Sequence, residues 1–402
     1  MSFFKKDELK YLWPFYLDSL LLSILFIYPA FIVPYLINIG FSLFQLGLFT
    51  SVFGIASMIF EVPTGAIADK FGRKFSTRLG FFLSGVVVLI AYFFKSFYIL
   101  LILVFLWGAF GTFISGARDA WIVDLLKSKK RKDLVSEYYT KNHSFAAFGM
   151  LMSGIVGALL VKKLGVSILW IATGGSFILT FIAYGFAAEH FIKSNRIKTI
   201  GESLSELILH TKKSVRYSWN HKVLFRMLLM ILIISLGIGF VGDLTWYPLL
   251  QNYGLADYYF GYFFSCTFIL SMVIPFLIKP LAKKIGGYVK FLTLVLGLMA
   301  VILFLTYFTS NLVYAIVIAI VFFSMWDFFH PARSILFQEF TPSKMRATIG
   351  SLESMIYSIG ITISYPLVGL LATKIGVQNA IAVGGFIFII AAGIIWGIRE
   401  KR

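Results

Sequence analysis

The sequence has few charged residues, few of them acidic, and a single cysteine. The low charge and the single cysteine each exclude something about the protein. Only 13% of the 402 residues are charged while 59% are hydrophobic, and the mean hydropathy is +0.89, which excludes an ordinary water-soluble domain. The single cysteine, Cys266, excludes an internal disulfide, and we expect it to face lipid or the protein interior.

Motifs for nucleotide use and catalysis are also missing. The chain has no G-x-x-x-x-G-K-[ST] loop, so we do not expect ATP to drive its activity. It has no H-E-x-x-H motif and no Cys/His cluster, and its five histidines are scattered, which leaves no plausible catalytic triad. We therefore predict neither an enzyme nor a bound metal or cofactor.

Long apolar runs take up most of the chain. Each is about 20 residues or longer, the length that a helix needs to cross a bilayer, and we count about twelve. An even number of spans places both termini on one side, and the basic residues gather in the loops of that side. The sequence predicts a multi-pass protein of the cell (plasma or inner) membrane with cytoplasmic termini. The net charge of +18 then comes from basic residues that fix the orientation of the chain in the membrane, and we expect no nucleic-acid partner.

The two halves of the chain resemble each other. A nearly constant offset of about 214 residues lays Pro34, Asn38, Gly40 and Gly47 on Pro248, Asn252, Gly254 and Gly261. An offset of about 215 lays Arg118 on Arg333. Single coincidences of Gly and Pro carry little weight, but a steady offset predicts a duplicated helical unit.

A charged turn bounded by glycines separates the second apolar run from the third. It reads Gly65-Ala-Ile-Ala-Asp69-Lys70-Phe-Gly72-Arg73-Lys74. This resembles the signature loop of the major facilitator superfamily, G-x-x-x-D-[RK]-x-G-R-[RK], in its complete form. The second copy, around Lys283 and Gly286, has lost the aspartate.

The resemblance covers nearly the whole chain and implies an all-α membrane fold of two pseudo-symmetric six-helix bundles. We expect the bundles over residues 1–187 and 223–402, joined over 188–222 by a cytoplasmic connector with an amphipathic helix. The family places its substrate between the bundles, where spans 1, 4, 7 and 10 line a cavity. Its signature loop acts in gating, and the likeness implies that Asp124 pairs with Arg73.

Charged residues inside the spans are costly, so each needs a reason. We predict that the deep ones serve substrate binding or proton coupling: Asp18, Arg118, Asp119, Asp243, Asp327, His330, Arg333 and Glu353.

Some of these residues have structural alternatives. Arg118 could pair with Asp18, and Arg333 with Glu353, in which case both arginines are structural ions. Asp243 and Asp327 have no obvious cationic neighbour, and burial disfavours the ionised carboxyl, so such a group can exchange a proton. His330, one turn after Asp327, titrates in the same range. The alternative for Asp327 is a hydrogen bond to the backbone or to Ser324.

Small and polar residues also form helical stripes. Gly108, Thr112, Ser115 and Asp119 share one face of the fourth span, and Ser324, Asp327, Pro331, Ser334 and Gln338 do the same in the tenth. We expect these faces to line a water-filled cavity. Small residues also mediate helix packing, which is the competing interpretation.

Together these features favour a monomeric prokaryotic secondary transporter of a small molecule, driven by the proton gradient. The leading hypothesis is an exporter of amphiphilic compounds, similar to the drug:proton antiporters of the superfamily. One departure stands in the fourth span, where those antiporters often have R-x-x-Q-G and this chain has Gly116-Ala-Arg118-Asp119-Ala-Trp121. Three alternatives remain: a proton symporter for a sugar, amino acid or organic anion, a lipid or lipid-linked-sugar flippase, and a non-transporting membrane scaffold.

Overall fold

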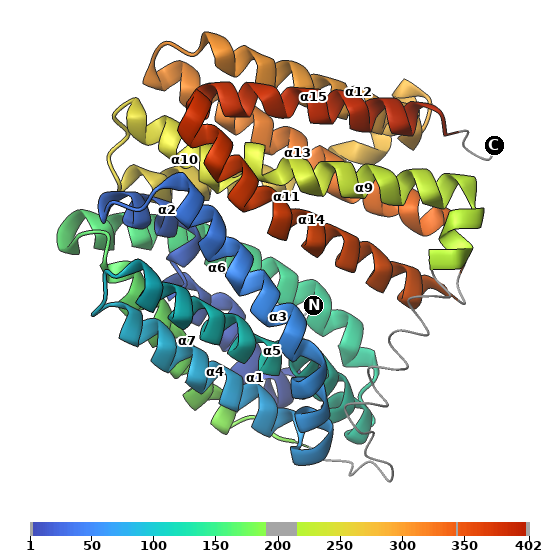
Figure 1. Cartoon of the computed structure of the whole chain (residues 1–402). Helices are drawn as coiled ribbons and strands as arrows, with labels where there is room; N and C mark the ends of the chain where they lie inside the picture. Colours follow the sequence, from blue (N-terminus) through green and yellow to red (C-terminus); the bar gives the residue numbers. More distant parts are fainter. Residues whose placement is uncertain (1–2, 190–214, 343–344, 399–402) are drawn as a thin grey trace. The chain divides into compact units, whose positions relative to one another are not determined.

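The protein is described here by a computed structural model covering residues 3–189, 215–342 and 345–398. Within these residues the regular structure is entirely helical, and twelve helical spans are long and apolar enough to cross a membrane (Figure 1). The predicted all-α fold class and the number of spans are confirmed.

Six spans make up the first half. They are a first span in three pieces (α1, Glu8–Leu20; η1, Leu22–Leu25; α2, Tyr28–Asn38), then α3 (Leu43–Phe71), α4 (Arg73–Ala91), α5 (Phe97–Ser128), α6 (Asp133–Leu164) and α7 (Ile168–Gly185).

Six more spans make up the second half. They are α9 (Lys222–Val241) with α10 (Asp243–Asn252), α11 (Tyr259–Ile285), α12 (Tyr288–Leu305) with η2 (Thr306–Phe308), α13 (Leu312–Phe340), α14 (Arg346–Ile375) and α15 (Val377–Trp396).

The first and seventh spans are both interrupted, at equivalent places. The first loses its α-helical hydrogen bonding between Leu20 and Tyr28, and the seventh is broken at Gly242, whose backbone is extended. The repeat offset of about 214 lays the start of α2 on this break. Interrupted spans at matching positions of two repeats are typical of the substrate region of transporters.

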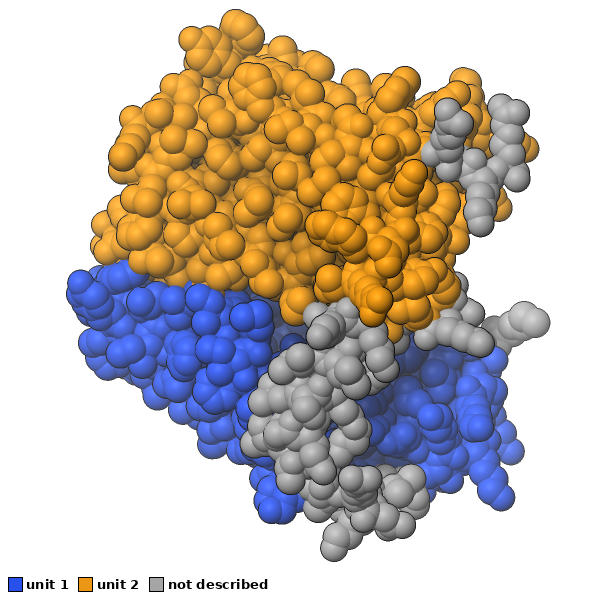
Figure 2. All heavy atoms as spheres, turned by 45° about the vertical axis from the view of Figure 1, so that its right-hand side comes forward, with its two compact units in different colours: residues 1–35, 52–204, 257–265 blue, residues 36–51, 205–256, 266–402 orange. Residues whose placement is uncertain are grey.

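The chain forms two compact units, coloured separately in Figure 2. Unit 1 comprises residues 1–35, 52–204 and 257–265, and unit 2 comprises 36–51, 205–256 and 266–402. The units differ from the expected bundles because two short segments group with the other half. The expected bundle boundaries remain a prediction, and most of the expected connector helix lies outside the described residues.

The segment 36–51 groups with unit 2 through close helix packing and side-chain hydrogen bonds. Ser51, on α3, donates a hydrogen bond of 2.7 Å to the Thr362 carbonyl of α14. The Gln251 amide of α10 donates to Asn38 at 2.9 Å. Gly47 lies directly against the Tyr365 carbonyl, where a larger residue would clash.

In unit 1 the segment 257–265 packs on α6 in a similar way. Ser265 of α11 donates a 2.7 Å hydrogen bond to the Leu151 carbonyl. Gly154 and Gly261 face each other so closely that neither position has room for a Cβ atom. Small residues therefore set the close approach of helices in both units, which is the usual means of helix association in a bilayer.

Candidate functional site

The signature loop joins α3 to α4 and is anchored to two other helices of unit 1. Arg73, the first residue of α4, forms an ion pair with Asp124 of α5, so the expected pairing is present. The Lys74 ammonium donates to the carbonyls of Gly185 and Ala187, at 2.9 and 2.6 Å. Carbonyls at the end of a helix lack an N–H partner within the helix. The lysine supplies that partner and complements the negative end of the α7 dipole.

The remaining signature residues occupy the turn itself. Gly72 has a φ of 101°, which favours glycine, and it is the residue at which α3 gives way to α4. Asp69 and Lys70 are exposed at the end of α3, and a Cβ at Gly65 would meet nothing within 4 Å. Among the described residues neither Asp69 nor Lys70 has a hydrogen bond or ion pair to a side chain.

Asp18 is the centre of a polar cluster in unit 1. Its carboxylate lies 2.9 Å from the Arg118 guanidinium and accepts hydrogen bonds from Thr180 at 3.0 Å and Tyr184 at 2.9 Å. The Arg118 guanidinium also lies over the Tyr184 ring. The pair of Asp18 and Arg118, predicted from the similar depth of the two residues in the membrane, is therefore present. Two hydrogen-bond donors from α7 reinforce it.

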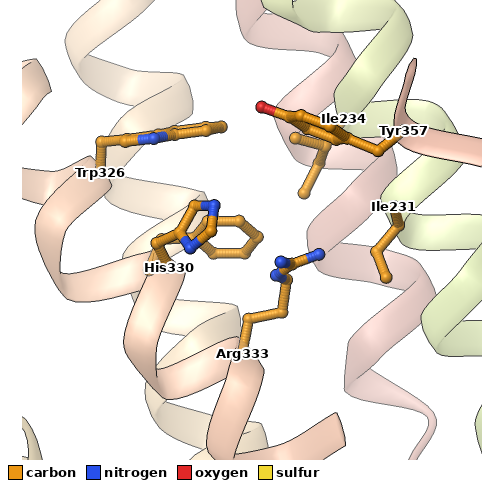
Figure 3. A pocket seen from close by; sticks show the side chains of 7 residues that line it. Ile231, Ile234, Trp326, His330, Arg333 and Tyr357 are labelled. Carbon is orange, nitrogen blue, oxygen red and sulfur yellow. The ribbon is translucent and has the colours of Figure 1, made fainter. Parts of the chain in front are cut away.

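A second arginine is paired in unit 2. Arg333 lies 2.7 Å from Glu353, and its side chain is almost completely buried. Figure 3 shows Arg333, His330 and Trp326 projecting from α13 into a small cavity, opposite Tyr357 of α14 and two isoleucines of α9. The cavity thus combines a paired guanidinium, an imidazole and aromatic faces.

Three acidic residues stand apart from these pairs. Asp119 is exposed on α5, Asp243 is the first residue of α10, and Asp327 is half-buried on α13. In the described part of the chain, none of the three has a side-chain hydrogen bond or an ion pair. The suggested bond between Ser324 and Asp327 is wrong, because the Ser324 hydroxyl donates to Ile320 of its own helix at 2.8 Å.

The polar stripe of α5 divides into two parts. A Cβ at Gly108 would lie 2.5 Å from the Phe53 carbonyl, and Thr112 accepts a hydrogen bond of 3.0 Å from Thr64, so this part packs on α3. Ser115 and Asp119, farther along, are exposed. The expected cavity face is therefore wrong for the first part, where small residues serve helix packing.

The predicted stripe of α13 is fully accessible only in its last part: Ser334 and Gln338 are exposed, whereas Ser324, Asp327 and Pro331 are half-buried. His330, which is not a member of the stripe, is exposed one turn before Ser334, so His330, Ser334 and Gln338 form an accessible line along α13.

One buried ionic cluster of unit 1 was not predicted. Glu8, fully buried, accepts hydrogen bonds from Lys141 at 2.8 Å and from Tyr16 at 2.7 Å. Lys5 lies 2.9 Å from Glu137, and this hydrogen bond raises the pKa of the Lys5 ammonium. The i,i+4 spacing of Glu137 and Lys141 is a signal in the sequence, but it does not identify Glu8 as their partner.

No group of three or more His, Cys, Asp or Glu residues within the described ranges is arranged to hold a metal ion. The chemistry that these residues offer within each unit is ionic and hydrogen-bonding. Unit 1 has the Arg118–Asp18 pair and Asp119, and unit 2 has the Arg333–Glu353 pair, Asp243, Asp327 and His330. Each set suits the binding and release of small charged species.

Sequence comparison links the chain to one family. A sequence model of the Major Facilitator Superfamily matches residues 19–352, with a second match over 261–402. The MFS-type transporter YxaM of Bacillus subtilis is 24% identical over 377 residues, covering 92% of this chain and 90% of YxaM. The MFS-type transporter MJ1560 of Methanocaldococcus jannaschii is 22% identical over 386 residues, 95% of each chain.

Solved structures share the fold at low identity. The nucleoside transporter NupG superposes with a TM-score of 0.73 at 14% identity, over 97% of this chain and 98% of NupG. A D-xylose-proton symporter gives 0.69 at 15% identity, over 96% of this chain and 98% of the symporter. The likeness extends over whole chains and concerns the fold alone.

Proposed function

The chain belongs to the Major Facilitator Superfamily, and on this premise we propose that it is a proton-coupled secondary transporter that exports small amphiphilic compounds. It is a transporter and not an enzyme, and its substrate is a small molecule. In this proposal it acts as a monomer in the cell membrane, with both termini in the cytoplasm and its two halves alternating access to the substrate.

The observation that carries the proposal is the contrast between acids and arginines. Arg118 and Arg333 are each neutralised by a carboxylate of their own unit. Asp119, Asp243 and Asp327 have no such partner among the described residues. An ionised carboxyl away from water is unfavourable unless it is compensated, so the half-buried Asp243 and Asp327 favour binding either a proton or a cation. A group that holds one or the other, but not both, couples the two movements in opposite directions.

A proton symporter is the second candidate. Two proteins that share the fold support it: NupG is a nucleoside transporter, and the other is a D-xylose-proton symporter. The version that carries an organic anion loses its main support, since both deep arginines are already paired. The scaffold hypothesis requires Asp18, Asp119, Asp243 and Asp327 all to be held by packing bonds. Within the described ranges, Asp18 alone has such bonds.

Transport in liposomes tests the proposal. The full chain would be reconstituted with a pH-sensitive dye inside, under an imposed proton gradient, and given a panel of lipophilic cations, nucleosides, sugars and organic anions. We expect lipophilic cations to cause proton flux, and Asp327→Asn or Asp119→Asn to abolish it because the exchanged proton loses its site.

Asp7→Asn is the matched control, since Asp7 lies before the first span and asparagine tolerates its φ of 63°. It should transport like the wild type. Flux driven only by nucleosides or sugars would replace export with symport. If no compound moves protons in correctly inserted protein, proton-coupled export is wrong, and lipid translocation becomes the next assay.

A further inference from the structure

An open cavity lies at the start of α9 and shares no described lining residue with the cavity around Arg333. Its volume is about 430 Å³, within the range of about 300–1,000 Å³ usual for ligand sites. It is lined by Arg216, Tyr217, Asn220 and His221, from the helical turn that leads into α9, and by Met345. All of these residues belong to unit 2.

The lining is rich in hydrogen-bond donors, and its described residues include no carboxylate. Arg216 carries a guanidinium with five N–H groups, and Asn220 carries an amide; both residues are exposed. His221 accepts the backbone N–H of Leu224 on its Nδ1 at 3.3 Å, so the neutral ring has its proton on Nε2 and donates from there. Several donors, with no competing carboxylate among the described lining residues, favour an anion with several acceptor oxygens, such as a phosphate group.

The surroundings of the cavity are suited to lipid. The membrane span begins at Lys222, directly after this turn, which places the cavity at the depth of the lipid headgroups. Trp219 is 69% exposed and packs edge-to-face on Phe225, with ring centroids 4.9 Å apart. Val215 is 44% exposed. An exposed tryptophan beside a basic side chain at the end of a span is typical of the membrane interface.

We propose that this cavity binds the phosphate group of an anionic phospholipid, with the acyl chains lying against Trp219 and Phe225. The arginine supplies the positive charge, both the arginine and the histidine supply donors for the phosphate, and the tryptophan supplies the apolar contact that a soluble phosphate compound does not need. The proposal is independent of the transported substrate, because none of its residues belongs to the transport site.

Native mass spectrometry of the full chain in detergent tests it. The protein would be given equal amounts of phosphatidylglycerol and phosphatidylcholine with the same acyl chains. We expect preferential retention of phosphatidylglycerol, lowered about fivefold by Arg216→Gln, as for one basic contact to an anionic lipid. Asn220→Leu removes a donor without changing charge and should also lower retention. Trp219→Ala should lower retention of both lipids.

Lys283→Gln is the charge-matched control, because Lys283 is an exposed residue of α11 that does not line the cavity. Equal losses in Lys283→Gln and Arg216→Gln would overturn the proposal, since the effect would then be one of overall charge. Glycerol phosphate serves as a soluble competitor. If it displaces the lipid from the wild type as readily as from Trp219→Ala, the cavity is a site for soluble phosphate compounds, and the assignment to lipid is wrong.

Discussion

The guanidinium of Arg333 lies 2.7 Å from the carboxylate of Glu353, and these two side chains are only 10% and 19% exposed. They lie on α13 and α14, two helices of unit 2. No other acidic side chain among the described residues forms an ion pair with Arg333. The charge of this buried guanidinium is therefore compensated by a single residue.

Glu353→Gln should destabilise the protein, because it leaves the Arg333 charge buried without a counter-ion. Breaking one partner of a buried pair costs about 3–5 kcal/mol. Thermal unfolding of the purified protein in detergent measures the loss. The double variant Arg333→Gln/Glu353→Gln should recover much of it, and Glu339→Gln, exposed at the end of α13, should have little effect. A double variant less stable than the single one would show that the charge is compensated elsewhere.

Tyr184→Phe tests the cluster around Asp18 without changing charge. The substitution removes the 2.9 Å hydrogen bond from the Tyr184 hydroxyl to the carboxylate while keeping the ring that packs in the core. A hydrogen bond to a charged group contributes about 1.5–3 kcal/mol, and we expect a loss of that size in thermal unfolding. Tyr139→Phe, on a half-exposed ring with no such bond in the described structure, is the control. Equal stability of the two variants would mean that Arg118 and Thr180 alone hold Asp18.

Features set by one helix or by the repeat were predictable from the sequence. The length of the apolar runs gives the twelve spans, and depth along the spans suggested the pairs of Arg118 with Asp18 and of Arg333 with Glu353. The resemblance to the signature loop supplied the pair of Arg73 with Asp124. In each case the position of a residue along its own helix, or a motif, carried enough information.

Contacts between helices that neither a shared depth in the membrane nor a motif indicates were not predictable. The burial of Glu8 against Lys141 could be predicted only if α1 and α6 were known to be neighbours, and the sequence of neither helix contains that information. The stripe of α5 has one helical period throughout, yet Gly108 and Thr112 meet α3 while Asp119 is exposed. The periodic pattern of one helix does not show over which part of that helix a neighbouring helix packs.

Lys74→Met should weaken the attachment of the signature loop to α7. The Lys74 ammonium is the donor to two carbonyls at the end of that helix, and methionine keeps the apolar stem without the donor. Since hydrogen bonds to charged groups contribute about 1.5–3 kcal/mol, the melting temperature should fall by several degrees. Lys70→Met, in the same loop but exposed, should change stability by less than about 0.5 kcal/mol. Equal shifts would indicate a general effect of lost charge.

Gly47→Ala and Gly393→Ala should change stability in opposite directions. Both glycines lie inside helices of unit 2, where alanine is favoured by about 1 kcal/mol over glycine through helix propensity. A Cβ at position 393 would meet nothing within 4 Å, so Gly393→Ala should keep that gain. A Cβ at position 47 would press on the Tyr365 backbone carbonyl, which cannot turn aside as a flexible side chain can. Gly47→Ala should therefore separate α3 from α14 and lower the melting temperature. If both variants melt higher than the wild type, the close approach of α3 to α14 contributes nothing to stability.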